Sequence, residues 1–418
     1  MLRRWLQASI EEWNTQRSLR GIIMTGARQV GKTTLARHAC PEMAYVNLDD
    51  PLTHAEFEQI GGEEFAATYP QAVLDEAQKV PALFHLVKYG IDTTRTNRYM
   101  LLGSAQILLL GKVRESLAGR GAVKELYPLA FAERLPESPK PWIADILDRL
   151  DRNQAPEVLT PKKVREIVGA SIREWKRHLA WGGMPAQMEG PEESEWKEWL
   201  KNYVATYLQR DLRDLARISD LAPFRKCEQL IALRTGSLLN YSELARDAGG
   251  SVQTARNYCN YLDLSFQTIL LEPYFISPAK RLMKSPKLYM IDVGIQRILS
   301  SQWEGMTGQQ YESIVAAELK KMLSAFHPEW RLCHLRTLDG LEVDFLLVHR
   351  DRAVAIEVKY ADRVHPQDAR RLVRLEEVTG LPTIRKYVVY EGHEIQRLRE
   401  GVLGIPACVF FGPGTSAG

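Results

Sequence analysis

The sequence has few cysteines, and none of them forms a C-x-x-C pair. The five cysteines are odd in number and widely spaced, which argues for reduced thiols and against a zinc site. Because thiols stay reduced in the cytoplasm, we expect a cytoplasmic protein.

Long apolar runs and a strong charge of one sign are also missing. No stretch approaches the ~18 consecutive apolar residues of a membrane-spanning helix, and no apolar core follows the basic start, Met1–Trp5. We therefore expect no membrane association. The net charge is only +3, so a case for nucleic-acid binding must depend on local clusters of positive charge.

What the sequence does have is a hydrophobic content of 45% over 418 residues. These values are typical of a soluble globular protein with about two to four domains.

The clearest motif is the stretch 26–34, which reads G-A-R-Q-V-G-K-T-T between an apolar run and a helical segment. A strand, a glycine loop and a helix in this order bind the phosphates of a nucleotide. Gly26 and Gly31 let successive N–H groups point at one anion, Lys32 reaches the β- and γ-phosphates, and Thr33 offers its hydroxyl to Mg²⁺. The alternative is a glycine turn with a stray lysine. The residues expected to bind ATP are Gly26, Arg28, Gln29, Val30, Gly31, Lys32, Thr33 and Thr34.

Two acids follow a second apolar strand, at Asp75 and Glu76. In open α/β sheets the carboxyl ends of the strands carry the site. We expect Asp75 to hold the Mg²⁺ shell opposite Thr33, and Glu76 to polarise the attacking water. The alternative is that both acids cap the helix predicted at 80–94.

Two further residues are candidates for the γ-phosphate. Ser104 ends the strand predicted at 98–104 and is expected to act as a sensor, a helix N-cap or both. Arg120 lies in a glycine loop and is expected to act as an arginine finger, in its own subunit or in a neighbour's. A solvated loop arginine is the alternative for Arg120.

The middle of the chain predicts a helix-turn-helix with a wing. Glycines at 249 and 250 form the turn, and Ser251 is a good N-cap for the third helix. A polar face on that helix is expected to meet a DNA groove, and four cations of the wing hairpin are expected to neutralise backbone phosphates. Winged helices also bind proteins, which is the alternative. The predicted DNA-binding residues are Gln253, Thr254, Arg256, Asn257, Lys280, Arg281, Lys284 and Lys287.

The last hundred residues predict a helix, three strands, a second helix at 366–377 and a further strand. Glu357 and Lys359 are two apart on one strand and therefore share a face. We expect Asp344, Glu357 and Glu312 to hold a divalent metal, with Lys359 orienting or activating a water for phosphodiester hydrolysis. A plain surface pair between Glu357 and Lys359 is the alternative.

These motifs resemble bacterial and archaeal AAA-type ATPases with a C-terminal winged helix and a PD-(D/E)XK nuclease-like domain of formerly unknown function. The resemblance implies that Lys32 and Thr33 bind nucleotide and magnesium and that Asp75 and Glu76 support hydrolysis. Residue 343 is a valine where the superfamily name has proline, a change that leaves the carboxylate of Asp344 in place. The motifs that carry the resemblance are 26–34, 74–78, 102–104, 119–120, 181–185, 235–236, 284–289 with Asp292, 342–345 and 357–359.

The resemblance also implies a homo-oligomeric ring, most simply a hexamer, with the nucleotide at the subunit boundary. We therefore expect an α/β protein with a P-loop AAA-type parallel-sheet core, a helical lid, a winged helix-turn-helix and an α/β nuclease-like domain. The predicted function is an ATP-driven motor on duplex or branched DNA, with ATP, Mg²⁺ and a possible second divalent metal. The alternative is an ATP-dependent switch that acts on a protein partner and has an inactive nuclease-like domain. The expected boundaries are 1–134, 135–222, 223–305 and 306–418.

Overall fold

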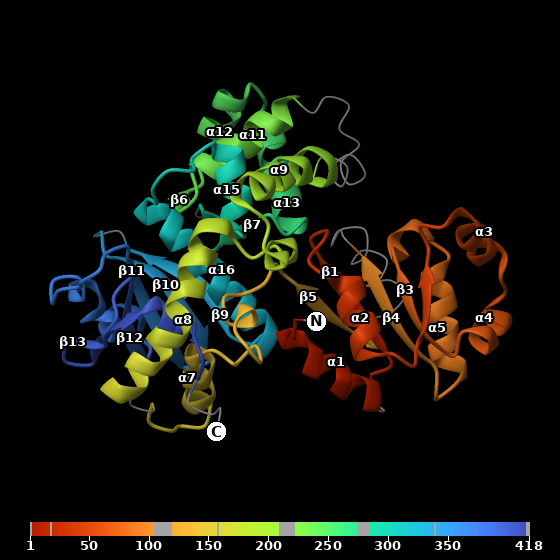
Figure 1. The fold of residues 1–418 in the computed structure, drawn as a ribbon, viewed down its shortest axis with the longest axis horizontal. Coiled ribbons are helices and arrows are strands. Elements are labelled where there is room, and N and C mark those ends of the chain that lie inside the picture. The colour runs from red at the N-terminus through yellow and green to blue at the C-terminus, as the bar shows by residue number, and fades with distance from the viewer. Residues whose placement is uncertain are drawn as a thin grey trace.

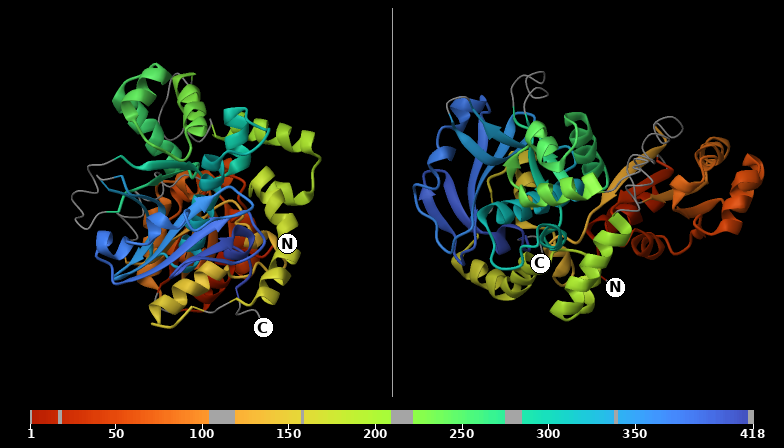
Figure 2. Two further views of the ribbon diagram at one scale, coloured as in Figure 1. Left: turned by 90° about the vertical axis from the view of Figure 1, so that its left-hand side faces the viewer. Right: turned by 90° about the horizontal axis from the view of Figure 1, so that it is seen from above.

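A computed structural model describes residues 2–16, 19–103, 119–156, 159–208, 222–274, 285–337 and 340–414. An N-terminal α/β core and a C-terminal α/β sheet lie at opposite ends of the long axis, and a mostly helical body lies between and above them (Figures 1 and 2). Among the described residues, none of the helices combines the length and apolar composition needed to cross a bilayer. All five cysteines are buried free thiols.

The N-terminal core is a five-stranded sheet of order β2-β3-β4-β1-β5, in which every neighbouring pair is parallel. Its strands are β1 (Gly21–Gly26), β2 (Ala44–Asn47), β3 (Gln71–Asp75), β4 (Arg98–Gly103) and β5 (Gly121–Leu126). Its helices in the described ranges are α1 (Trp5–Thr15), α2 (Lys32–Ala39), α3 (Pro51–Gln59), α4 (Gly62–Thr68) and α5 (Leu83–Thr93), with a 3₁₀ turn η1 (Ala77–Lys79).

Alternation along β1 shows why this sheet needs helices on both faces. Ile22 and Met24 belong to the apolar cluster that contains α1 and α2, whereas Ile23 belongs to the cluster with α3, α4 and α5. Because successive side chains point to opposite faces, an apolar residue at every position requires cover on both sides. The parallel-sheet core predicted from the sequence is therefore present.

The helices predicted as a lid lie elsewhere than expected. Helices α7 (Trp142–Asp151) and α8 (Pro161–Trp181) pack on the C-terminal domain, as Figure 1 shows, instead of on the N-terminal core. The Trp142 ring contacts Tyr387, and Trp175 stacks on Phe411 with 6.2 Å between ring centroids. Burial of these large aromatic surfaces decides where the helices lie. The remaining elements of this segment are η3 (Pro185–Glu189), α9 (Glu193–Tyr203) and η4 (Val204–Leu208).

Among its described residues, the middle body contains the helices α11, α12 and α13 and a three-stranded antiparallel sheet of order β6-β8-β7. Gly249 adopts a left-handed φ of 78° at the turn, and Ser251 accepts a hydrogen bond from the Thr254 N–H at 3.0 Å, as an N-cap does. Its elements are α11 (Ala222–Leu233), β6 (Ser237–Leu238), α12 (Tyr241–Ala248), α13 (Val252–Leu264), β7 (Thr268–Leu271) and β8 (Lys287–Met290), followed by α15 (Val293–Ser300).

The C-terminal domain is a six-stranded mixed sheet of order β13-β14-β12-β11-β10-β9. The helix predicted at 366–377 is instead two short turns, η5 (Arg370–Leu372) and α17 (Leu375–Thr379). The other elements are α16 (Gly308–Phe326), β9 (Arg331–Arg336), β10 (Glu342–His349), β11 (Arg352–Lys359), β12 (Thr383–Tyr390), β13 (Gln396–Arg399), β14 (Val402–Pro406) and α18 (Ala407–Phe410).

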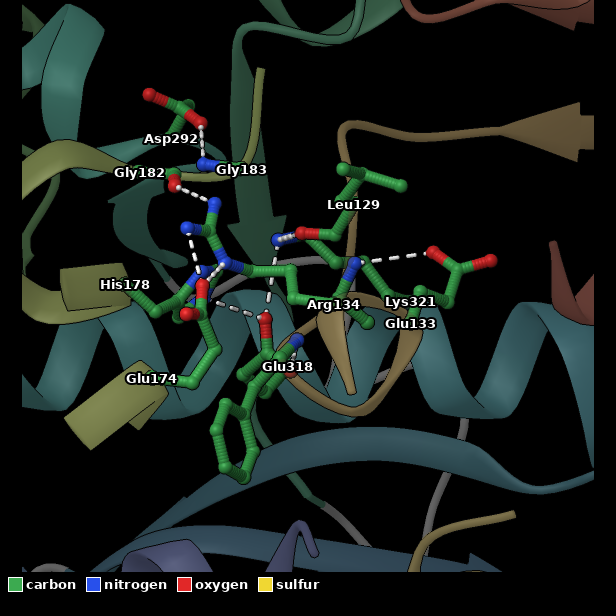
Figure 3. A network of polar contacts seen from close by, with 12 residues as sticks. Leu129, Glu133, Arg134, Glu174, His178, Gly182, Gly183, Asp292, Glu318 and Lys321 are labelled. Carbon is green, nitrogen blue, oxygen red and sulfur yellow. Dashed lines mark hydrogen bonds and ion pairs between the residues drawn. The ribbon is translucent and has the colours of Figure 1, made fainter. Parts of the chain in front are cut away.

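A buried carboxylate on α16 joins these bodies (Figure 3). Glu318, 1% exposed, accepts hydrogen bonds from the Phe131 N–H at 2.8 Å and from Lys321 Nζ at 3.0 Å, and it contacts His178 Nε2 at 3.0 Å. Phe131 lies in the segment that leaves the N-terminal core, and His178 lies on α8. We call this set, with Lys321, the Glu318 junction.

A second buried group extends the Glu318 junction. Arg134 donates to Glu174 and to the Gly182 carbonyl, at 2.7 and 3.0 Å. Asp292 accepts from the Gly183 N–H at 2.7 Å and also caps α15 (Figure 3). Residues from four segments far apart in sequence therefore meet at one buried polar site, which fixes their relative positions.

The Glu318→Gln variant tests how much this junction contributes to stability. Burial alone raises the pKa of Glu318, but Lys321 and His178 lower it to about 2. Since the folded pKa lies below the ordinary value, the stabilisation is present above pH ~4.5 and is lost as the pH falls toward 2. At pH 7 we expect the substitution to cost about 3 kcal/mol, because it leaves a buried ammonium without its carboxylate.

Urea denaturation at several pH values measures this effect. The difference in midpoint between wild type and Glu318→Gln should shrink as the pH falls from about 4.5 to 2. Glu166, exposed on α8, is the matched control, and Glu166→Gln should change stability by less than ~0.5 kcal/mol. Equal midpoints for both variants at pH 7 would contradict a stabilising junction.

Candidate functional site

The predicted phosphate loop lies between the end of β1 and the start of α2. Two residues of the loop have positive φ, 60° at Gln29 and 92° at Gly31, and these values bend the chain back on itself. Helix α2 begins at Lys32, so its unpaired N–H groups and the positive end of its dipole face the loop. The buried Lys32 ammonium donates to the carbonyls of Gly26 and Ala27, at 2.9 and 2.7 Å.

The other predicted loop residues differ in exposure. Gln29 and Thr34 are exposed, and Arg28 and Thr33 are half-buried. Val30 is fully buried in the apolar core, so its side chain anchors the loop and only its backbone remains for a ligand.

Thr33 and Asp75 meet at the carboxyl end of the sheet. The Thr33 hydroxyl donates to Asp75 Oδ2 at 2.6 Å, and the Tyr45 hydroxyl donates to the same oxygen at 3.0 Å. Hydroxyl and carboxylate oxygens are ligands that Mg²⁺ accepts, so this pair fits the predicted magnesium site. Burial and the neighbouring Asp75 raise the pKa of Tyr45 to about 12, so Tyr45 stays a hydrogen-bond donor.

Glu76 follows in a left-handed conformation, with φ 53°. Such a conformation is unusual for a residue with a side chain and occurs often at functional sites. Neither acid caps the helix predicted at 80–94, because α5 begins at Leu83 with Ala82 as its N-cap. Glu76 occupies the N-cap position of the 3₁₀ turn η1, without a capping hydrogen bond from its side chain. The capping alternative is therefore not what the structure shows.

Two contacts that the sequence did not reveal hold the loop in place. Arg4, which precedes α1, donates from Nη1 to the Val30 carbonyl at 2.7 Å and from Nε to Glu133 at 2.9 Å. Tyr203, at the end of α9, donates to the Arg28 carbonyl at 3.3 Å. Nothing in the local pattern at residues 4 or 203 distinguishes these contacts, because both depend on long-range packing.

Arg120 is not at the phosphate loop of its own chain. It directly precedes β5, where Gly121 pairs with Gly21 at the amino end of β1, whereas the loop follows Gly26 at the carboxyl end. The two ends of β1 are ~17 Å apart at the usual rise per residue. Arg120 forms two hydrogen bonds with Asp92, at 2.6 and 3.0 Å. This corrects the expectation of an arginine finger acting within one subunit. Ser104 lies outside the described residues.

A second cluster of charges lies where β10 and β11 meet. Asp344 Oδ2 accepts from the Val358 N–H at 2.9 Å. Glu357 is fully buried, and its nearest cations are Lys359 Nζ at 3.6 Å and Arg371 Nη1 at 4.0 Å. Burial and the charge of Asp344 raise the pKa of Glu357 to about 8. A cavity of about 300 Å³ beside it is lined by Glu357, Lys359, Gln367, Asp368, Arg370 and Arg371.

Lys287 is the largest difference from the sequence-based prediction. It was expected on a solvent-exposed hairpin, but its side chain is 5% exposed and lies among the acids. Its Nζ is 2.8 Å from Glu342 Oε1 and 3.2 Å from Glu312 Oε1. Burial alone would lower the pKa of Lys287, but these carboxylates outweigh burial and the pKa is raised. The expectation that Lys287 faces DNA is therefore corrected.

Glu312 does not join Asp344 and Glu357 as a third metal ligand. Its Oε1 accepts from the Tyr289 hydroxyl at 2.5 Å as well as from Lys287. Within the described ranges, the one trio of ligand atoms that all lie within 4.8 Å of each other belongs to a different place, at Asp151, His327 and Glu329. Among the described residues, the predicted three-carboxylate metal site is thus not assembled.

Helix α13 presents the predicted polar face. Gln253 and Arg256 are exposed, and Gln253 donates to Asn257 Oδ1 at 3.0 Å. Thr254 is half-buried and belongs to the N-terminal turn. The Arg256 guanidinium lies over the Tyr241 ring, 4.5 Å from its centroid, which limits its mobility. Lys280, Arg281 and Lys284 lie outside the described residues.

Comparison with protein families gives three matches along the chain. Residues 19–135 match the family described as "AAA domain". Residues 172–304 match "Domain of unknown function (DUF8612)", and residues 307–409 match "Domain of unknown function (DUF4143)". The N-terminal core therefore matches an AAA domain, in agreement with its parallel sheet and phosphate loop.

Similar whole proteins are known in two mycobacteria. The uncharacterized proteins Rv2008c of Mycobacterium tuberculosis and Mb2031c of Mycobacterium bovis are each 27% identical over 406 residues, which cover 92% of this chain and 80% of theirs. Among solved structures, the Walker-type ATPase PABY2304 of Pyrococcus abyssi is 14% identical, with a TM-score of 0.45, over 72% of this chain and 96% of that one. The PCH-2 protein of C. elegans is 15% identical, with a TM-score of 0.25, over 44% of this chain and 58% of that one.

Loss of the lysine ammonium tests the phosphate loop. We expect Lys32→Ala to lower the rate constant of ATP hydrolysis by roughly 10²- to 10³-fold, because one positive charge that stabilises the transition state is removed. Steady-state phosphate release measures the effect. Lys162→Ala, an exposed position on α8, is the control and should hydrolyse ATP at the wild-type rate. Equal rates for the two variants would mean that another site hydrolyses the nucleotide.

Proposed function

We propose that the protein hydrolyses ATP and uses the nucleotide state to control a DNA-binding C-terminal half, with duplex or branched DNA as the ligand. The observation that carries this proposal is the bracing of the phosphate loop by residues outside it. The carbonyls of Arg28 and Val30 accept hydrogen bonds from Tyr203 and Arg4, and Arg4 is paired with Glu133. A change of loop shape on nucleotide binding would reach all three residues.

The site supplies the parts that ATP hydrolysis needs. Lys32 and the first turn of α2 hold the phosphates, and Thr33 and Asp75 hold Mg²⁺, which neutralises phosphate charge when bound. Glu76 orients the attacking water. These roles require that Lys32 leave the carbonyls of Gly26 and Ala27, to which it is bonded in this structure.

The connection to the C-terminal half runs through buried polar groups. Glu133 Oε2 accepts from the Ala130 N–H at 3.0 Å, and the next residue, Phe131, donates to Glu318 on α16. α16 also carries Glu312, six residues earlier, which contacts Lys287. A displacement at Arg4 therefore has a continuous path of direct contacts to the acidic cluster.

The middle body supports DNA as the ligand. The order of its helices and strands is the one expected for a winged helix, and α13 carries the exposed Gln253 and Arg256, with the half-buried Asn257 bonded to Gln253. Side chains of these types hydrogen-bond to phosphates and base edges. Strand cleavage is not part of the proposal, because the three acids of the C-terminal domain are not assembled around one point.

A second candidate is an ATP-dependent switch that acts on a protein partner. The position of Lys287 favours it, because one of the four cations expected to contact DNA is enclosed by carboxylates. Both candidates share the ATPase domain and differ only in the ligand of the C-terminal half.

ATP turnover measured with no DNA, linear duplex, single strand and a four-way junction separates the two. We expect duplex or junction DNA to raise the rate severalfold, and the effect to fall steeply with salt because phosphate contacts release counterions. Arg256→Ala should reduce the ratio of the rates with and without DNA. Arg165→Ala, exposed on α8, is the matched control. A rate that stays flat across all DNA forms and salt concentrations would favour the protein-directed switch.

We also propose a ring, hexameric by resemblance to AAA-type ATPases, in which Arg120 serves a neighbour's nucleotide. Its distance from the phosphate loop of its own chain, together with its partly exposed side chain, supports a role across a subunit boundary.

Mixing two inactive variants tests this arrangement. The Arg120→Ala variant keeps an intact nucleotide site with Glu76, whereas the Glu76→Gln variant keeps the Arg120 side chain. If Arg120 acts on a neighbour, mixed oligomers should recover ATP hydrolysis that neither variant shows alone, because some sites then combine Glu76 with an Arg120 from the next subunit. Full activity of Arg120→Ala by itself would show that Arg120 is only the surface partner of Asp92. Light scattering with and without nucleotide gives the oligomeric state.

A further inference from the structure

The cation at the centre of the acidic cluster comes from another body of the protein. Lys287 is the first residue of β8 in the middle body, whereas Glu312, Glu342 and Asp344 belong to α16 and β10 of the C-terminal domain. The Lys287 Nζ is 2.8 Å from Glu342, 3.2 Å from Glu312 and 4.0 Å from Asp344. One ammonium thus meets three carboxylates at a site that is almost closed to solvent.

Tyr289 completes this arrangement from the same strand. Residues two apart on a strand share a face, so Tyr289 and Lys287 approach the acids together. The Tyr289 hydroxyl donates to the same Glu312 oxygen that Lys287 contacts, at 2.5 Å. Glu312 is therefore held by two donors of β8.

The charges of the cluster nearly balance without any added ion. Among the residues that the structure describes, four carboxylates face three side-chain cations. Buried carboxylates are costly unless they are paired. The four acids are Glu312, Glu342, Asp344 and Glu357, and the three cations are Lys287, Lys359 and Arg371.

A divalent metal would need the oxygens that Lys287 holds. Magnesium, manganese and calcium bind oxygen at about 2.0–2.6 Å, and an ammonium among the same carboxylates repels the ion and fills part of its space. The acids can therefore be satisfied by the lysine or by a metal, but not fully by both.

We propose that Lys287 is a built-in cation that takes the place of a divalent metal in this cluster, so that Glu312 and Asp344 can bind a metal only when β8 withdraws. The cluster is then a closed contact between the middle body and the C-terminal domain. Withdrawal of β8 both frees the carboxylates and separates the two bodies, so metal affinity reports the position of the strand. This inference concerns neither ATP nor DNA and stands independently of the proposed function.

Mn²⁺ titration of the full chain without nucleotide or DNA tests the inference by isothermal calorimetry. Lys287→Met should gain one Mn²⁺ site per chain or bind Mn²⁺ at least roughly tenfold more tightly than wild type, since removal of the ammonium leaves its carboxylates uncompensated. The gain should disappear in the double variant Lys287→Met with Asp344→Asn. Lys287→Arg, which keeps the positive charge, is the matched control and should bind Mn²⁺ as wild type does.

Three results would overturn the proposal. The first is a Lys287→Met protein that folds, as judged by circular dichroism, but gains no Mn²⁺ affinity. The second is a Lys287→Arg protein that gains as much affinity as Lys287→Met. The third is a double variant, Lys287→Met with Asp344→Asn, that keeps the gain. If Lys287→Met does not fold, Glu342→Gln decides instead. It removes the nearest partner of Lys287 without removing a proposed metal ligand, so it should raise Mn²⁺ affinity, and an unchanged affinity would overturn the proposal.

Discussion

The buried carboxylate of Glu318 is the interaction on which the arrangement of the bodies depends. It receives hydrogen bonds from the exit segment of the ATPase domain and from its own helix, and it contacts the histidine of α8. An ionised group in the interior is stable only when all its partners stay in place, so each contact makes the others necessary. The orientation of the ATPase domain relative to the C-terminal sheet is thus set by a few directional polar contacts, with apolar packing around them.

Buried carboxylates are also paired with cations at the acidic cluster, but there the pairing can be released. At Glu318 the cation, Lys321, comes from the next turn of the same helix and cannot leave without unfolding of α16, whereas at Glu312 and Asp344 the cation comes from a strand of another body. A charge compensated by a distant part of the chain can be released by a movement between bodies. The position of Lys287 therefore joins domain geometry to the chemistry of the site.

Local pattern was sufficient to predict much of this molecule. The apolar strands, the glycine loop and the pairing of Thr33 with Asp75 follow from residue order, because parallel strands bring their carboxyl ends to one edge. The strand predicted at 98–104 is found as β4, which covers Arg98–Gly103. The place of α7 and α8, the contacts of Arg4 and Tyr203, and the burial of Lys287 were not predictable in this way. Each of these features depends on a partner more than 20 residues away in the sequence. The residues around Lys287, from 276 to 290, include no acid, so the local pattern does not reveal that distant carboxylates enclose it.

The bracing of the phosphate loop has a consequence for where this protein can be divided. The family match to the ATPase domain covers residues 19–135, yet two of the side chains that hold the loop carbonyls, Arg4 and Tyr203, lie on either side of that range. The range that matches the AAA family is therefore shorter than the range that holds the phosphate loop in place. A fragment that keeps both contacts to the loop must extend from residue 4 to residue 203. Such a fragment would include α7 and α8 but would lack the C-terminal residues on which their aromatic side chains pack. A fragment cut at the limits of the family match would lack both of these contacts to the loop.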